Sequence, residues 1–234
     1  MKKNLTLISL VLLALFVLCS CFIEIDPSEP EPKTEGFTFT SVFKGPVKDK
    51  DGKITSYQFM CYVNNNTGVA VENLELIIDW KDQLGELIFS DTVTIPRLEK
   101  GGKWPVGVIR DKAYEITMLK DSTASIRARK PSSDLSRYST NVVVTGHIYH
   151  PQSGDPSYAT GYARHYNSYE ILDPIVYVVS ESSGKIIEYG AVKYPNIFYP
   201  ELSTLDFEVT LNPPAKDPKN SKTSYYIVGT RREI

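Results

Sequence analysis

Hydrophobic and polar residues alternate along most of the chain from Phe37 onward, which is the period of a strand with one buried face. Phe37, Phe39 and Phe43 fall on odd positions of the first run, and alternation resumes at residues 54–63 after a turn rich in Asp and Gly. This arrangement predicts a β-hairpin. Further runs predict strands at residues 74–80, 87–95, 104–109 and 125–129, whereas residues 112–119 fit one short helix.

The second half of the chain repeats this order of runs at an offset of roughly one hundred residues. Residues 61–63 align with residues 161–163, and residues 76–80 align with residues 175–179. The shared order predicts a tandem duplication, with one domain at residues 37–130 and another at residues 139–234. Short strands and turns at this density predict an immunoglobulin-like β-sandwich in each half, so the expected fold class is all-β.

Specific residues recur within these two patterns. In the first half they are Val63-Asn64-Asn65, Ile78, Trp80, Asp82, Gly85, Leu98, Gly101 and Trp104; in the second they are Ala163, Asn167, Tyr177, Val179, Glu181, Gly184 and Phe207. Their order resembles the FxLYD-type immunoglobulin-like domains of exported bacterial lipoproteins. The second copy departs from that pattern at Tyr199-Pro200-Glu201, where a glycine is usual. The resemblance implies an interaction or spacer role and no catalytic residues.

The N-terminal segment has the layout of a secretory signal peptide, because two lysines precede an apolar run at residues 10–18. That run is too short for a transmembrane helix, which needs about twenty residues. Leu18, Ser20 and Cys21 follow, and they resemble the lipobox of bacterial lipoproteins. The resemblance implies removal of residues 1–20 and a lipid anchor on Cys21. Cys19 is the rival acceptor, but the bulky residue before it suits the signal peptidase poorly.

Residues 21–36 are rich in proline and acidic side chains, which predicts an extended, disordered tether. Acidic residues close to Cys21 also resemble the surface-export signal of Bacteroidota lipoproteins, although Phe22 and Ile23 intervene; a plain solvated spacer is the alternative. We therefore expect a protein of the cell envelope, held at the outer membrane or cell surface by the lipid on Cys21.

The charge of the chain limits the kinds of partner it could bind, and its cysteine content limits the disulfides it could form. Loss of Lys2 and Lys3 from the 26 basic residues leaves 24 against 28 acidic ones, which argues against a nucleic-acid partner. Only Cys61 remains after processing and acylation, so we expect no disulfide. Cys61 shares the parity of Phe59 and Val63 in an alternating run, which predicts a buried, inert thiol.

One segment has part of a calcium-binding pattern. Residues 49–52, Asp-Lys-Asp-Gly, place two carboxylates before a glycine, as in an EF-hand loop. Lys53 and Met60 stand where further oxygen ligands are needed. A tight hairpin turn is therefore our interpretation.

Two other groups have weak chemical signals. His147, His150 and His165 could approach a zinc ion from neighbouring strands, but the first two have opposite parity, and surface histidines explain the same pattern. Glu170 and Asp173 could in principle serve a glycosidase, although no nucleophile or metalloprotease motif accompanies them. We expect no metal and no cofactor.

Tyrosine is concentrated in the second domain, which holds eleven of the fifteen. Strand propensity explains most of them, but tyrosine is also favoured on surfaces that bind a partner. At residues 158–164 the small residues share one face, so an aromatic face is expected to point outward. The candidate binding surface consists of Tyr158, Tyr162, Arg164, Tyr166 and Tyr169.

These observations predict a non-catalytic binding or spacer module for an unknown envelope protein or glycan. The alternative is a carbohydrate-binding accessory protein, or a glycan-active enzyme that uses the tyrosine-rich face of the second domain.

Overall fold

The computed structural model describes residues 35–49, 51–81, 84–111, 125–128, 137–195, 197–198, 204–215, 218 and 220–233. The predicted signal peptide, the predicted lipid acceptor Cys21, almost all of the predicted tether and the predicted helix at residues 112–119 lie outside the described residues. So does most of the predicted domain boundary at residues 130–139.

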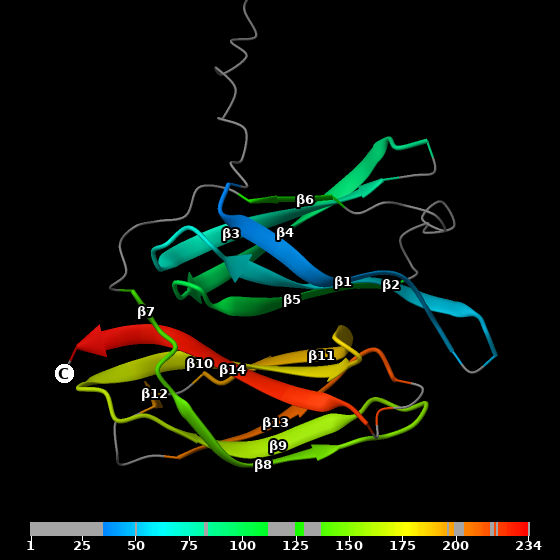
Figure 1. Ribbon diagram of the computed structural model, residues 1–234. Coiled ribbons are helices and arrows are strands. Elements are labelled where there is room, and N and C mark those ends of the chain that lie inside the picture. Colours follow the sequence, from blue (N-terminus) through cyan, green and yellow to red (C-terminus); the bar gives the residue numbers. More distant parts are fainter. Residues whose placement is uncertain are drawn as a thin grey trace, which may run out of the picture. The chain divides into compact units, whose positions relative to one another are not determined.

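Every regular element in this part of the chain is a β-strand, which confirms the predicted all-β class (Figure 1). The first six strands are β1 (Phe37–Lys48), β2 (Ile54–Asn65), β3 (Val71–Lys81), β4 (Leu87–Leu98), β5 (Lys103–Asp111) and β6 (Ser125–Ala128). The others are β7 (Tyr138–Ser139), β8 (Val143–His150), β9 (Tyr158–Arg164), β10 (Tyr169–Ser182), β11 (Lys185–Lys193), β12 (Ile197–Phe198), β13 (Leu205–Thr210) and β14 (Lys222–Glu233).

The strands form four antiparallel sheets that pair into two sandwiches. Sheet 1 has the order β1-β2-β5 and faces sheet 2, with the order β4-β3-β6, across the first core. Sheet 3 has the order β11-β10-β14-β7, with β12 beside β10, and faces sheet 4, β13-β9-β8, across the second core. Leaving aside β7 and β12, which have no equivalent in the described part of the first sandwich, the chain crosses between the two sheets in the same order in each sandwich, as in immunoglobulin-like folds.

The two sandwiches also share an irregularity in their first strand. The register of β1 shifts after Thr40, which pairs with Tyr62, and the register of β8 shifts after Thr145, which pairs with Tyr162. A residue with positive φ follows in each strand, Ser41 in β1 and Gly146 in β8. A β-bulge at the same place opposite the same tyrosine is what a duplicated sandwich would retain.

The sequence alignment of the third strands was one residue off. Leu76 and Ile78 lie in the first core, and their counterparts in the second core are Val176 and Val178. The alignment had instead paired residues 76–80 with residues 175–179. Because side chains in a strand alternate between faces, a slip of one residue assigns each of them to the wrong face.

The two sandwiches pack against each other through sheets 1 and 3. Residues 57–63 of β2 are buried without interruption, although their sequence suggests alternation. Phe59 and Cys61 lie in the first core, whereas Met60 and Tyr62 on the opposite face form a cluster with sheet 3. Sheet 1 is therefore covered on both faces, and the sheets stack in the order 2, 1, 3 and 4 (Figure 1).

Strand β7, at the end of the segment that joins the two sandwiches, is hydrogen-bonded to both of them. Tyr138 and Ser139 of β7 pair with β14 of the second sandwich. In the first sandwich, the buried Glu72 accepts a hydrogen bond from the backbone N–H of Tyr138 at 3.1 Å, and Arg97 donates to the carbonyl of Tyr138 at 3.3 Å. Arg97 also pairs with Glu72 at 3.2 Å. These contacts hold β7 in place between the two sandwiches.

Candidate binding face of the second sandwich

Strand β9 divides its side chains between the second core and the outer face of sheet 4. Ala159 and Ala163 are fully buried, and Gly161 packs so closely that a Cβ atom there would lie 2.6 Å from Phe207 Cζ. Small residues on this side let β9 approach the core, so the larger residues point outward. The predicted division of β9 into a small inner face and an aromatic outer face is confirmed.

The pairing register places outward residues of the three strands in rows across sheet 4. Directly opposite residues in antiparallel strands share a face. Three complete rows are Thr145–Tyr162–Asp206, Ile148–Thr160–Glu208 and His150–Tyr158–Thr210. At the end of the sheet beyond Thr145, Val143 pairs with Arg164, whose side chain bonds Thr204 just before β13. We call this set of twelve residues the sheet-4 face.

Tyr162 lies at the centre of the sheet-4 face with half of its surface, 50%, exposed. Its ring leans over the bulge in β8, since a Cβ atom built on Gly146 would lie 2.9 Å from Tyr162 Cδ2. Gly146 has a φ of 58°, a conformation that glycine adopts without strain. The glycine therefore provides the space in which the ring rests against the backbone of the sheet.

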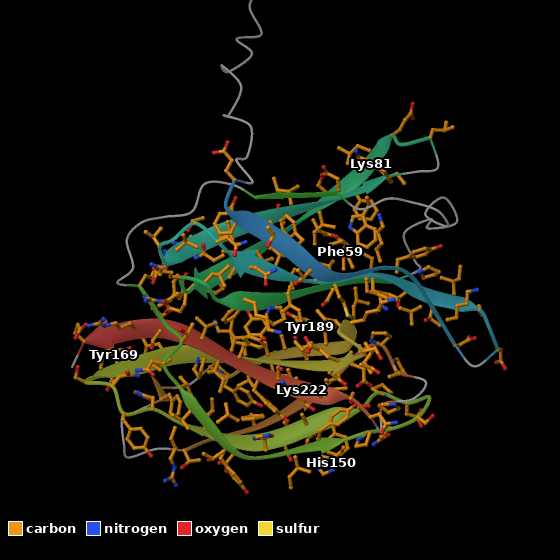
Figure 2. All side chains as sticks on the ribbon, viewed as in Figure 1. Phe59, Lys81, His150, Tyr169, Tyr189 and Lys222 are labelled. Carbon is orange, nitrogen blue, oxygen red and sulfur yellow. The ribbon has the colours of Figure 1, made fainter. Side chains whose placement is uncertain are left out.

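A second aromatic group lies further along the same face. The rings of His150 and Tyr158 are stacked, with centroids 4.2 Å apart and planes 11° apart. The His150 Nε2 atom lies 3.4 Å from the hydroxyl of Thr160. Figure 2 labels His150 on this outermost layer.

Strand β13 brings acidic groups to the face. Asp206 and Glu208 are both exposed and point outward, whereas Phe207 between them is buried. The hydroxyl of Tyr194 accepts from the backbone N–H of Glu208 at 3.0 Å and donates to its carbonyl at 3.1 Å, which covers the edge of β13. Arg164 donates from Nε to the hydroxyl of Thr204 at 3.1 Å. The face thus combines an aromatic centre, an acidic strand and one tethered cation.

The structure brings together three of the five predicted surface residues. Tyr158, Tyr162 and Arg164 share the sheet-4 face, and Tyr166 lies exposed in the loop that follows β9. Tyr169 does not join them, because it begins β10 in sheet 3 (Figure 2). Its hydroxyl lies 2.8 Å from that of Ser139, and the guanidinium of Arg231 lies 4.2 Å from its ring centre. Tyr169 therefore stabilises the junction with β7.

Several other tyrosines of the second half belong to the contact between the sandwiches. Tyr177 meets Trp104 of the first sandwich edge-on, with centroids 5.2 Å apart, and Tyr226 lies 6.4 Å from Tyr62. Tyr189 lies between the sandwiches, against Gly107 (Figure 2). Sequence reasoning missed this role. The signal would have been their parity within β10, β11 and β14, which is opposite to that of neighbouring second-core residues such as Val176, Val178 and Ile227.

A buried carboxylate was also missed. Glu188 in β11 is fully buried and accepts hydrogen bonds from the hydroxyls of Tyr149 and Ser157, the latter at 2.6 Å. The backbone N–H of Ala215 donates to it at 3.4 Å. Glu188 shares the parity of Gly190 and Val192, which face the second core, and that alternation was the available signal. The group joins three segments of the second sandwich that are distant in sequence.

The histidines do not converge. His147 packs against Tyr225 with centroids 4.7 Å apart, and His150 stacks on Tyr158. The expectation of surface histidines is wrong for His165, which is 1% exposed and bonds the carbonyl of Phe198 at 2.7 Å through Nε2. It follows the buried Ala163 at the same parity, so its inward direction could have been inferred. In the described residues, no group of His, Cys, Asp and Glu could hold a metal ion.

Other candidate chemistry has structural explanations. The Asp49 carboxylate accepts from the backbone N–H groups of Asp51 and Lys53 at 3.0 and 2.9 Å, as expected for a tight turn. Glu170 pairs with Arg232, and Asp173 pairs with Lys193 at 3.0 Å. Cys61 is fully buried, as predicted, and burial raises the pKa of its thiol to about 12. A protonated, enclosed thiol is a poor nucleophile.

In the described part of the chain, no helix is long and apolar enough to cross a membrane. Comparison with known proteins gives no match, either to a family model or to a curated protein. The features of this protein that bear on function are therefore the sheet-4 face and the N-terminal sequence.

Proposed function

We propose that this protein is a lipid-anchored component of the bacterial cell envelope that binds a partner, without catalysis, through the sheet-4 face. The lipobox-like sequence at Cys21 supports the anchor, and the acidic, proline-rich residues 21–36 would hold the sandwiches away from the lipid. The partner is an envelope protein or a glycan.

The observation that carries this proposal is the uncovered sheet-4 face. Val143, Ile148 and Tyr162 are all large, exposed and on one face of one sheet. The corresponding face of sheet 1 is covered by sheet 3. A group of exposed apolar side chains rimmed by polar ones is typical of an interaction surface.

The shape and chemistry of this face favour binding over catalysis. A general acid at neutral pH needs a protected environment that shifts its pKa. Asp206 and Glu208 instead point outward, exposed on an open strand surface. Turnover of a glycan that depended on either carboxylate would contradict the non-catalytic assignment and support the enzyme alternative.

The anchor and the face can be tested in one experiment in a bacterium that lipidates exported proteins. A photo-crosslinking amino acid replaces Thr145, which is exposed beside Tyr162, or Val69, which is exposed in the first sandwich. We expect a defined adduct from position 145, none from position 69, and loss of the adduct from the membrane fraction in Cys21→Ala. Equal adducts from both positions, or unchanged lipid labelling in Cys21→Ala, would refute the proposal.

A further inference from the structure

The sheet-4 face and the outer face of sheet 1 occupy equivalent places in the two sandwiches, so their differences are informative. On sheet 1, Tyr62 is accompanied by Met60 and by Gly107, which pairs with Met60. On sheet 4, Tyr162 is accompanied by Thr160 and by Glu208, which pairs with Thr160. The tyrosine is kept, whereas the apolar side chain and the glycine are both replaced by polar residues.

These replacements remove what lets one sheet pack on another. Gly107 allows Tyr189 of sheet 3 to lie so close that a Cβ atom would be 2.5 Å from the ring. A carboxylate at that position, as in Glu208, holds an opposing sheet away and would be desolvated by it at considerable cost. The sheet-4 face is therefore unsuited to the flat apolar packing that sheet 1 uses.

The same residues suit a ligand that has both an apolar face and hydroxyl groups. Tyr162 rests against Gly146 and is half exposed, so its accessible ring surface can stack on the C–H face of a pyranose. Thr145 and Asp206 lie opposite Tyr162 on the two flanking strands, about 5 Å to either side. Hydroxyl and carboxylate groups at the rim of the ring can bond the equatorial hydroxyls of such a sugar.

The length of the face favours a chain of sugars over a single one. Tyr158, stacked on His150, lies four residues from Tyr162 along β9, or about 13 Å at the rise of a strand. Between these rings lie the hydroxyl of Thr160 and the carboxylate of Glu208. An extended oligosaccharide could contact both aromatic groups and the polar row between them.

The charge of the face selects among glycans. Two exposed carboxylates, Asp206 and Glu208, oppose one cation, Arg164, which is bonded to Thr204. Carboxylates on a binding surface repel an anionic ligand and so lower its affinity relative to a neutral one. From these features we infer that the sheet-4 face binds neutral glycan chains and discriminates against glycans that carry carboxylates or sulfates. This inference rests on the proposed function, because it names the ligand of the same face.

The test uses the full chain, purified in detergent, and measures retention on immobilised polysaccharides. The neutral probes are hydroxyethylcellulose, a yeast mannan, a soluble β-1,3-glucan and glycogen, and the acidic probe is polygalacturonate. We expect retention on a neutral probe and not on polygalacturonate. Tyr162→Ala should weaken retention about tenfold or more, which corresponds to about 1.4 kcal/mol.

Three further variants separate loss of the ring surface from misfolding. Tyr162→Phe keeps the ring and should retain binding, whereas Gly146→Ala should weaken it, because its Cβ atom displaces the Tyr162 ring. Val69→Ala, in the first sandwich, is the control. Circular dichroism and melting temperature check that each variant is folded.

Failure of the inference is distinguishable from failure of the proposed function. If no neutral probe retains the wild-type protein, if Tyr162→Ala binds equally well, or if polygalacturonate is bound as strongly, the inference is wrong. A protein adduct from position 145 that requires Tyr162 would then leave the proposed function standing with a protein partner. Absence of both the adduct and glycan retention would refute the two proposals together.

Discussion

Gly107 is where the contact between the two sandwiches is most sensitive to substitution. It lies on the face of sheet 1 that meets sheet 3, and a Cβ atom there would be 2.5 Å from Tyr189 Cδ1. The Tyr189 backbone exchanges two hydrogen bonds with Asn212, at 2.8 and 2.9 Å, so the backbone of Tyr189 cannot move away without breaking them. Gly107→Ala therefore tests how much stability depends on this close contact between the two sandwiches.

Two opposing effects set the magnitude of this change. Alanine in a strand interior is more favourable than glycine by about 0.5–1 kcal/mol. Overpacking in a closely packed region costs about 1–3 kcal/mol. We expect a net loss of roughly 0.5–2 kcal/mol in the free energy of unfolding for Gly107→Ala and a larger loss for Gly107→Val. For a chain of this size, each kcal/mol lowers the melting temperature by about 2–4 °C.

Calorimetry and urea denaturation measure this loss, and a second substitution identifies its cause. Tyr189→Ala removes the ring that the new Cβ atom meets. In that background, Gly107→Ala should become neutral or stabilising, because only the strand preference remains. The difference between the two backgrounds is the interaction energy of a double-mutant cycle. An identical effect of Gly107→Ala in both backgrounds would show that contact with Tyr189 is not what makes this position sensitive.

Two further predictions concern buried titratable groups. Burial raises the pKa of Cys61 from 9.0 to about 12 and that of Tyr177 from 10.0 to about 12. Since folding favours the protonated forms, stability should be complete below about pH 9 and fall towards pH 12, by up to about 1.4 kcal/mol per pH unit for the buried thiol. The midpoints of urea denaturation between pH 8 and 11 measure this loss of stability. In Cys61→Ala, stability should fall less between pH 9 and 10. A wild-type stability that does not change from pH 8 to 11 would contradict the prediction. In the second sandwich, Glu188→Ala leaves Tyr149, Ser157 and Ala215 without their acceptor, and each lost partner costs about 1–3 kcal/mol. Glu188→Gln keeps an acceptor and should lose clearly less; equal losses would exclude the hydrogen-bonded group as the cause.

Local patterns were sufficient where the cause of the structure is local. The turn at Asp49 follows from side-chain bonds to nearby backbone groups. The inner face of β9 follows from the run Ala159, Gly161 and Ala163, whose small size suits only a closely packed core. Cys61 was correctly placed in a core for the same reason, since it alternates in step with Phe59 and Val63.

For two polar residues, the alternation of buried and exposed positions along the chain was a better predictor of burial than residue type. His165 and Glu188 are polar, and their polarity suggested the surface. Both are nevertheless buried: His165 follows the buried Ala163 by two residues, and Glu188 alternates in step with Gly190 and Val192, which face the second core. Hydrogen bonds make this burial tolerable: His165 bonds the carbonyl of Phe198, and Glu188 accepts from two hydroxyls. Such partners come from distant segments, so a local pattern cannot supply them.

The two aligned tyrosines show most clearly what a local pattern cannot decide. Tyr62 and Tyr162 both point away from the core of their own sandwich, each opposite a bulged strand. Tyr62 is 1% exposed, because sheet 3 covers it, whereas Tyr162 is 50% exposed. The difference depends on whether another sheet follows in the stack. The residues beside each tyrosine agree with this outcome, since Met60 and Gly107 permit close packing and Thr160 and Glu208 oppose it. A residue-by-residue comparison of the two sandwiches therefore indicates which outer face another described sheet covers, even where each sandwich alone gives the same alternating pattern.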